Sequence, residues 1–373
     1  MSLPVPVIAP ANSSSVDSGL VSLRTAVLSW LEALLVPVFG LTVSLILFGV
    51  FIEATGNPAL EVYAQMYRGA FGSAFSFQNT LLRAAPLMLT GLCTALPARL
   101  GLMVIGGEGA LVVGGVAAAG IAVPFAGSSP LVMQAAMALT GMLVGGLWVA
   151  AAGFLKVSRG VNETISSLLL SYIGIALMNH LVEGPLRDPA SLNKPSTLHI
   201  GEANMLGSLP GMDVHYGLLF GVIACLACWV LMDHSTFGFS GRVVGGNVRA
   251  ARLAGVPVAR LVVITCFLGG AAAGLAGMVE VAAVHGKANA SLVAGYGYTG
   301  ILVAFLAQQS PLGILPVALL LGGISASGGL LQRTFSLPDA TVNVLQGILF
   351  IVLLASESLR GKLRPFRRWT EGT

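Results

Sequence analysis

The sequence predicts an all-α, polytopic integral membrane protein. Of its 373 residues, 55% are hydrophobic and only 9% are charged, whereas soluble domains carry about 25% charged residues. The mean hydropathy is +0.88, and the apolar residues fall in runs close to the roughly 20 residues that cross a bilayer as a helix. Because so few charges cannot cover a water-facing surface, we expect the chain to be surrounded by lipid.

The apolar runs define about ten expected helices, which span the membrane or partly re-enter it. They lie at 34–52, 79–98, 102–124, 131–152, 162–182, 215–233, 261–284, 294–308, 311–331 and 340–357. The third run is rich in glycine, and the eighth is short and ends in a polar stretch before Pro311. Both are candidates for re-entrant half-helices, which are tolerated where they line a cavity or are buried in protein.

The runs belong to one expected transmembrane domain, residues 34–357, between two cytoplasmic tails at 1–33 and 358–373. The first tail lacks the charged start, apolar core and cleavage site of a signal peptide. Two loops are long: a polar, proline-containing loop at 183–214 and a basic loop at 234–260.

Lysine and arginine set the expected orientation, because cytoplasmic loops carry an excess of them. With ten crossings, one side holds thirteen: Arg24, Arg99, Lys156, Arg159, Arg242, Arg249, Arg252, Arg260, Arg360, Lys362, Arg364, Arg367 and Arg368. The other side holds five: Arg68, Arg187, Lys194, Lys287 and Arg333. Both termini and the 234–260 loop are therefore predicted to be cytoplasmic, and the 183–214 loop extracytoplasmic.

Motifs for catalysis are missing from the sequence. It contains no GxxxxGK[ST], HExxH or GxSxG pattern, and its five histidines lack ligand spacing. The four cysteines lie in apolar runs, where a small apolar filler is the ordinary interpretation. We therefore expect no catalytic residue, no metal site and no cofactor on this chain. The basic residues flank spans without interleaved aromatics, which argues against nucleic-acid binding.

Ionisable residues inside spans are costly and are candidates for function. Glu108 follows Gly106 and Gly107 and precedes Gly109. One interpretation places Glu108 at a cavity or in an inter-helix hydrogen bond. In the other interpretation, Glu108 caps the helix that follows it, where a carboxylate suits the positive end of the helix dipole.

The fifth run begins with Asn162 and Glu163, which suit an N-cap and a first helical turn. Capping and a role in a solute pathway or gate are both open for this pair. Ser167 and Ser171 follow on one face of the predicted helix, where they either line a polar path or hold helices together. Tyr296 and Tyr298 open the eighth run. They either stack on a flat polar solute or belong to an interfacial aromatic belt.

The basic loop contains the stretch GGNVRAARLAGVPVAR, residues 245–260. Asn247 can cap a short helix over 248–254, Gly255 can end it, and Pro257 follows. We expect Arg249 and Arg252 to project to one side and Ala250, Ala251 and Ala254 to form a small flat surface. A docking element is one interpretation of this segment, and an ordinary basic loop is the other.

Seven collinear stretches over residues 35–360 resemble one family, the permease subunits of bacterial ABC importers of the branched-chain amino acid/ribose type. The resemblance is strongest to the subgroup for simple sugars and nucleosides, which works with a basic-membrane-protein-type lipoprotein. The stretches are IGGEGALVVGG (105–115), VNETISSLLLSYI (161–173), EGPLRDP (183–189), GGNVRAARLAGVPVAR (245–260), GLAGMVEV (274–281), GYGYTGILVAFLAQQSPLGILPVALLLGG (295–323) and NVLQGILFIVLLASE (343–357).

The resemblance implies a multi-pass protein of the bacterial inner membrane with several partners. These are two cytoplasmic ATPase subunits that bind ATP and Mg²⁺, a second related permease in a heterodimer, and an extracytoplasmic solute-binding lipoprotein. The family's ATPase-contacting loop matches Gly246, Asn247, Ala250, Ala251, Ala254 and Gly255. On this basis, Ala251→Glu or Gly255→Trp is expected to uncouple ATP hydrolysis from transport.

Two positions depart from the family pattern. Met103-Val104 stand where Phe-Asn is usual, and Ser171 stands where Asn is usual before Tyr172. The second change keeps a hydrogen-bonding group but loses an amide, which leaves the solute open. The expected solute is a nucleoside first, a simple sugar such as ribose second and a branched-chain amino acid third. The alternative function is a proton- or ion-coupled secondary transporter with a relay of Glu108, Glu163 and Glu280.

Overall fold

The computed structural model describes residues 38–125 and 127–357, and over these ranges the chain is helical and contains no β-strand. The all-α prediction is thus confirmed. The strand-like pairings in the described ranges are two isolated β-bridges, Ser196 with Asn289 and Ser208 with His215. The predicted tails 1–33 and 358–373 lie outside the described residues.

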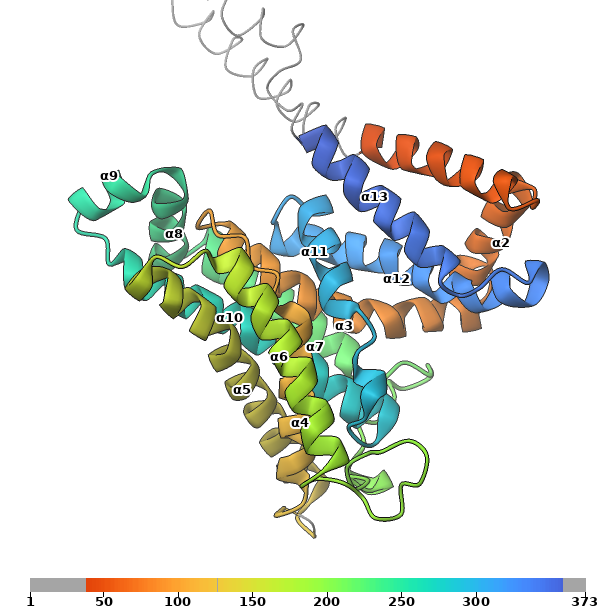
Figure 1. Ribbon diagram of the computed structural model, residues 1–373, viewed down its shortest axis with the longest axis horizontal. Helices are drawn as coiled ribbons and strands as arrows, with labels where there is room; N and C mark the ends of the chain where they lie inside the picture. Colours follow the sequence, from red (N-terminus) through yellow and green to blue (C-terminus); the bar gives the residue numbers. More distant parts are fainter. Residues whose placement is uncertain (1–37, 126, 358–373) are drawn as a thin grey trace, which may run out of the picture. The chain divides into compact units, whose positions relative to one another are not determined.

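Helices occur at every predicted apolar run (Figure 1). In chain order they are Val38–Ala54, α2 (Ala59–Phe71), α3 (Ala74–Ala98), α4 (Gly107–Ala122), α5 (Pro130–Arg159), α6 (Glu163–Glu183), η1 (Glu202–Asn204), α7 (Gly217–Asp233), α8 (Thr236–Gly246), α9 (Val248–Leu253), α10 (Val258–Val279), the π-helical η2 (Glu280–His285), η3 (Ala290–Leu292), α11 (Tyr296–Leu306), α12 (Pro311–Phe335) and α13 (Thr341–Glu357). The sequence analysis did not predict α2 or α8.

Five of the described helices are long and apolar enough to cross a membrane, or up to seven if each of two bent helix pairs forms one span. The runs singled out as weak became the short helices α4 and α11, of 16 and 11 residues. The predicted ten crossings and the cytoplasmic placement of the termini stay predictions.

The described chain divides into two compact units, which we describe separately. The larger one is Ile52–Gln346 and contains α2 to α12. In the smaller one, the described residues are 38–51 and 347–357. There, Gly40 lies so close to Leu353 that a Cβ on the glycine would be 2.9 Å from a Leu353 methyl carbon.

The centre of the larger unit is a glycine-lined contact between α5 and α10. Gly141 and Gly145 of α5 face Gly270 and Gly274 of α10, so the two GxxxG motifs of the sequence pack on each other. A Cβ on Gly274 would collide with the carbonyl oxygen of Gly141. Gly114 of α4 packs against Gly141 and Gly274 at the same contact. Small residues of this kind allow membrane helices to approach to backbone contact.

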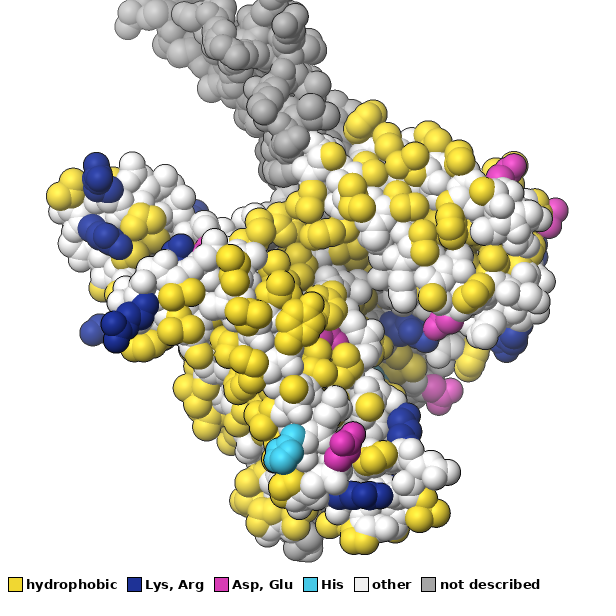
Figure 2. Space-filling view, viewed as in Figure 1, with side chains coloured by type: hydrophobic (Ala, Val, Ile, Leu, Met, Phe, Trp, Pro, Cys, Tyr) yellow, Lys and Arg dark blue, Asp and Glu magenta, His cyan; other side chains and the backbone are white. Residues whose placement is uncertain are grey.

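The outer face of the larger unit suits lipid. Figure 2 shows hydrophobic side chains over the face formed by α5 and α6, and Lys and Arg side chains around α9. On α5, Leu139, Leu143 and Leu147 are each more than half exposed and repeat every four residues along one face of the helix. A water-soluble protein rarely exposes such a continuous apolar surface. This surface supports the predicted membrane environment.

The larger unit has two distinct ends. In Figure 1, α8 and α9 lie beyond one end of α5 and α10, and the loop between α6 and α7 lies at the other end. By the charge count above, the α9 end is the predicted cytoplasmic end. The two ends hold different functional candidates.

The α5–α10 contact predicts a strong size limit at Gly274. We expect Gly274→Ala to lower the free energy of unfolding by about 1–3 kcal/mol, because an added methyl overpacks a contact of backbones. The measurement is unfolding of the purified chain in detergent. Gly329→Ala is the matched control, since a Cβ there would meet nothing within 4 Å; an equal loss in both variants would contradict the packing argument.

Candidate functional site

Glu108 forms a cap that joins two helices. It lies in the first turn of α4 and is fully buried, and its two carboxylate oxygens accept hydrogen bonds from the backbone N–H groups of Gly295, at 2.8 Å, and Gly297, at 2.6 Å. These amides open α11, so the carboxylate sits at the positive end of that helix. Gly297 has no room for a Cβ against the Glu108 backbone.

The structure thus places Glu108 in an inter-helix hydrogen bond, one of the arrangements predicted for it. The helix that it caps is α11 and not α4, the helix that the capping interpretation named. It does not line the cavity described below. Its role in a solute pathway stays a prediction.

Ser167 and Ser171 connect α6 to the segment that leads into α4. The Ser167 hydroxyl accepts a hydrogen bond from the N–H of Ile105 at 3.0 Å, and the Ser171 hydroxyl accepts one from the N–H of Gly109 at 3.4 Å. Both serines are buried. In this structure they hold α6 against the start of α4, the helix that carries Glu108.

Asn162 and Glu163 lie at the opposite end of α6 from its outer loop. The Asn162 side chain accepts hydrogen bonds from the N–H groups of Thr164 and Ile165, so it is the predicted N-cap. Glu163 is buried and forms an ion pair with Lys156 at 2.8 Å. Their contacts are those of a helix start, and a gating role stays a prediction.

A cavity of about 470 Å³ opens at the outer-loop end of the larger unit. Its lining comes from α3, the loop before α7, η2, η3 and the start of α11, and consists of Asn79, Leu82, Arg83, Leu206, Ser208, Asp213, His215, Glu280, Ala283, Val284, His285, Ser291, Ala294 and Tyr296. Of the predicted site residues, it includes Tyr296. Tyr298 is 38% exposed and lies outside this lining.

The loop over the cavity is fixed by backbone hydrogen bonds. The N–H of Leu206 donates to the carbonyl of Ala282 at 2.7 Å, and the N–H of Ile200 donates to that of Gly286 at 2.9 Å. Both acceptors lie in or next to η2. A π-helical turn of this kind is rare and often marks a functional site. The loop and η2 therefore hold the cavity's polar groups in place.

Sequence reasoning missed most of this lining. The sequence analysis named Glu280 only as a member of the alternative carboxylate relay, and it assigned no role to Arg83 or His285. A signal was present, because Arg83 and Glu280 are opposite charges inside two apolar runs, and buried charges are normally paired. Nothing in the sequence indicated that His215 would join them.

At the other end, α9 begins at Val248, as the sequence predicted, and ends at Leu253, one residue before the predicted end. The Asn247 side chain accepts hydrogen bonds from the N–H groups of Arg249 and Ala250, both at 3.0 Å. Gly255 follows the helix with φ +76°, a conformation that glycine favours. Gly246, Asn247, Arg249, Ala250, Ala254 and Gly255 are all exposed.

The prediction that Ala251 belongs to an exposed flat surface is wrong. Ala251 is fully buried and packs in a hydrophobic cluster with Val244 and Val258. One face of the six-residue helix α9 packs against the protein, and Ala251 lies at the centre of that face. The large apolar side chains that α9 does expose are those of Val248, at 42%, and Leu253, at 86%. The sequence analysis singled out neither.

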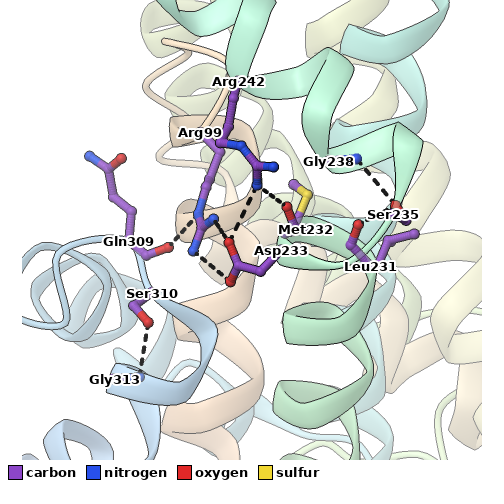
Figure 3. A network of polar contacts seen from close by, with 10 residues as sticks. All are labelled: Arg99, Leu231, Met232, Asp233, Ser235, Gly238, Arg242, Gln309, Ser310 and Gly313. Carbon is purple, nitrogen blue, oxygen red and sulfur yellow. Dashed lines mark hydrogen bonds and ion pairs between the residues drawn. The ribbon is translucent and has the colours of Figure 1, made fainter.

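A charged network lies beneath α8 and α9 (Figure 3). Asp233, at the end of α7, pairs with Arg99 after α3 and lies 3.5 Å from Arg242 of α8. Arg99 also donates to the carbonyl of Gln309 at 3.1 Å, in the turn between α11 and α12. Arg242 donates to the carbonyl of Met232 at 2.6 Å. The Asp233 carboxylate thus connects α8 to the ends of α7 and α3, and Arg99 extends the network to the turn between α11 and α12.

The chain is similar to a described protein family and to several named transport proteins. Residues 76–354 match the family described as the permease component of branched-chain amino acid transport systems. The glucose ABC transporter permease protein TsgB13 of Haloferax volcanii is 32% identical over 346 residues, which cover 90% of each chain. The guanosine ABC transporter permease protein NupP of Bacillus subtilis is 29% identical and covers 90% of this chain and 97% of its own. The nucleoside ABC transporter permease protein NupB of Lactococcus lactis is 26% identical, over 85% of this chain and 90% of its own.

The buried cap predicts a stability cost at Glu108. We expect Glu108→Ala to lower the free energy of unfolding by about 1–3 kcal/mol, because it leaves two buried N–H groups without acceptors. Unfolding in detergent measures the effect. Glu183→Ala removes an exposed glutamate at the end of α6 and should have little effect; equal stability of the two variants would disprove the structural role of the cap.

Proposed function

We propose that this chain, which belongs to the family of permease components of branched-chain amino acid transport systems, is the membrane subunit of an ATP-driven importer of nucleosides or simple sugars. As a family member it is a multi-pass protein of the inner membrane and a transport subunit, not an enzyme. The substrate class is taken from the names of the relatives. A nucleoside comes first, because two of the three named relatives carry guanosine or nucleoside in their names.

The observation that carries the ATP-driven mechanism is α9. It is short, capped and exposed, it lies at the predicted cytoplasmic end, and it presents Leu253 beside Arg249 and Arg252. The same segment matches the ATPase-contacting loop of the family that the sequence resembles, which supports a protein contact at this surface. We assign this surface to a cytoplasmic ATPase subunit that binds ATP and Mg²⁺.

The network below α9 supports a route for the motion. A push on α9 reaches α8 through the buried Ala251 and Val244, and reaches α3 and α7 through Arg242, Asp233 and Arg99. Contiguous chains of packed side chains and ion pairs are the kind of network that can carry coupling between distant parts of a protein. A second, related permease and an extracytoplasmic solute-binding lipoprotein complete the proposed transporter.

The carboxylate-relay alternative gains no support from the contacts. Glu108 accepts from backbone amides, Glu163 pairs with Lys156, and Glu280 lies 3.8 Å from His285. Each carboxylate thus has a different partner. A relay needs groups that pass a proton to one another.

Docking through α9 predicts that Leu253→Asp uncouples the transporter. We expect guanosine uptake to fall at least about tenfold, because a charge replaces the apolar centre of the contact, while membrane insertion and ATPase expression stay normal. Leu192→Asp is the matched control, a leucine that is 82% exposed in the loop at the other end. Unchanged uptake in Leu253→Asp would remove the docking assignment.

The two substitutions suggested by the sequence are poorer tests. Ala251→Glu would bury a charge in the cluster that anchors α9. Gly255→Trp would force a side chain into a backbone conformation with positive φ. Both would disturb α9 itself, so a loss of uptake would not be specific to docking.

The energy source separates the proposed class from the alternative. We expect uptake of radiolabelled guanosine by whole cells to stop when cellular ATP is depleted and to continue when an uncoupler removes the proton gradient. Purification of the chain from detergent-solubilised membranes should also recover an ATPase and a second permease. Uptake that fails only with the uncoupler would favour a secondary transporter.

A further inference from the structure

The cavity at the outer-loop end contains a histidine without a partner. His215 is 5% exposed, and neither of its ring nitrogens has a hydrogen-bond partner. Burial lowers the pKa of His215 below its ordinary value, so near neutral pH the ring is uncharged and offers one donor and one acceptor. Buried polar atoms are almost always hydrogen-bonded, so the ring lacks something that the cavity could supply.

The backbone holds His215 in this position. His215 pairs with Ser208 in an antiparallel bridge, and the N–H of Leu209 donates to the carbonyl of Val214 at 2.7 Å. Behind the ring, a Cβ on Gly217 would lie 2.7 Å from the His215 Nδ1 atom. The imidazole is therefore packed in place, and a hairpin and a glycine determine where it faces.

Three charged groups share the cavity with His215, namely the exposed Asp213 together with Glu280 and Arg83. Glu280, on η2, is 5% exposed, and its Oε2 atom lies 3.8 Å from Nε2 of His285. Arg83, on α3, is half-buried and acts on Glu280 electrostatically. Within the described residues the two form no direct ion pair. The cavity thus contains a cation and an anion that do not pair with each other.

The chemistry of Arg83, Glu280 and His215 selects a kind of ligand. A carboxylate only accepts hydrogen bonds, a guanidinium only donates them, and a neutral imidazole does both. A hydroxyl group can donate to the first, accept from the second and do either with the third. Arg83 and Glu280 offset each other, and Asp213 is exposed to solvent, so a neutral ligand fits best. Tyr296 adds an aromatic ring that can pack on the apolar face of a sugar.

We propose that this cavity binds the hydroxylated ring shared by free sugars and nucleosides, through Arg83, Glu280 and His215. The volume of about 470 Å³ lies within the range of small-molecule sites. The choice of ligand class rests on the proposed function, and the cavity lies on the predicted extracytoplasmic side. There it would receive the solute before the membrane is crossed.

Equilibrium binding tests the proposal without ATP or transport. Purified full-length permease in lipid nanodiscs is titrated with radiolabelled guanosine, ribose, glucose and leucine. We expect guanosine or at least one of the two sugars to bind, and leucine not to bind. Binding of guanosine alone assigns the site to nucleosides, and binding of a free sugar assigns it to the sugar ring. Preferential binding of leucine would overturn the proposal, since it would show a site for a zwitterion.

Three variants connect binding to the cavity. We expect Glu280→Gln and His215→Ala each to weaken binding about tenfold or more, because each removes a hydrogen bond in a desolvated site. Ala294→Trp keeps every polar group and fills the cavity, and should abolish binding. Glu183→Gln removes an exposed glutamate at the same end and should bind as the unchanged chain does. Equal binding in all four variants would refute the site.

The binding assay and the uptake assay fail independently. If binding depends on Glu280 but purification of the chain recovers no ATPase, the binding site is supported and the ATP-driven importer is refuted. If ATP-driven uptake is unchanged in Glu280→Gln and Ala294→Trp, the ATP-driven importer is supported and the proposed binding site is refuted. Each variant should elute from size-exclusion chromatography as the unchanged chain does, which shows that it is folded.

Discussion

Backbone contact between glycines is the constraint on which the larger unit depends. Gly141 and Gly145 meet Gly270 and Gly274 with no side chain between them, and Gly114 joins from α4. Lipid tails are as apolar as leucine, so burial of apolar surface gives little attraction between helices in a membrane. Close packing and hydrogen bonds must supply it. With α10 fixed in this way, its end presents η2 to the cavity, and α4 carries Glu108 to the start of α11.

Charged residues in this apolar chain have two kinds of role. Glu108 and the Asp233 network have all the partners that a structural group needs, since they cap one helix and join the ends of several others. Arg83 and Glu280 share a cavity without pairing, and His215 beside them has no partner. Position within an apolar run does not separate these roles. The number of hydrogen-bond and ion-pair partners separates the two roles, and only the folded structure shows these partners.

Local patterns in the sequence predicted local structure well. The apolar runs placed the long helices, Asn247 and Gly255 placed α9, and Asn162 placed the start of α6, because each depends on residues a few positions apart. Contacts between distant segments were less accessible. No local pattern shows that Glu108 caps a helix 187 positions later, or that Ala251 faces inward. α2 escaped notice because Glu61 and Arg68 interrupt its apolar pattern.

Helix α3 carries residues of both functional ends, and this has a mechanical consequence. Arg83 lines the cavity and Arg99 holds Asp233, and at 1.5 Å per residue they are separated by about 24 Å along the axis. A stiff rod of that length works as a lever: a tilt of about 5° at one end displaces the other by about 2 Å. Hydrogen bonds weaken or break over such a distance.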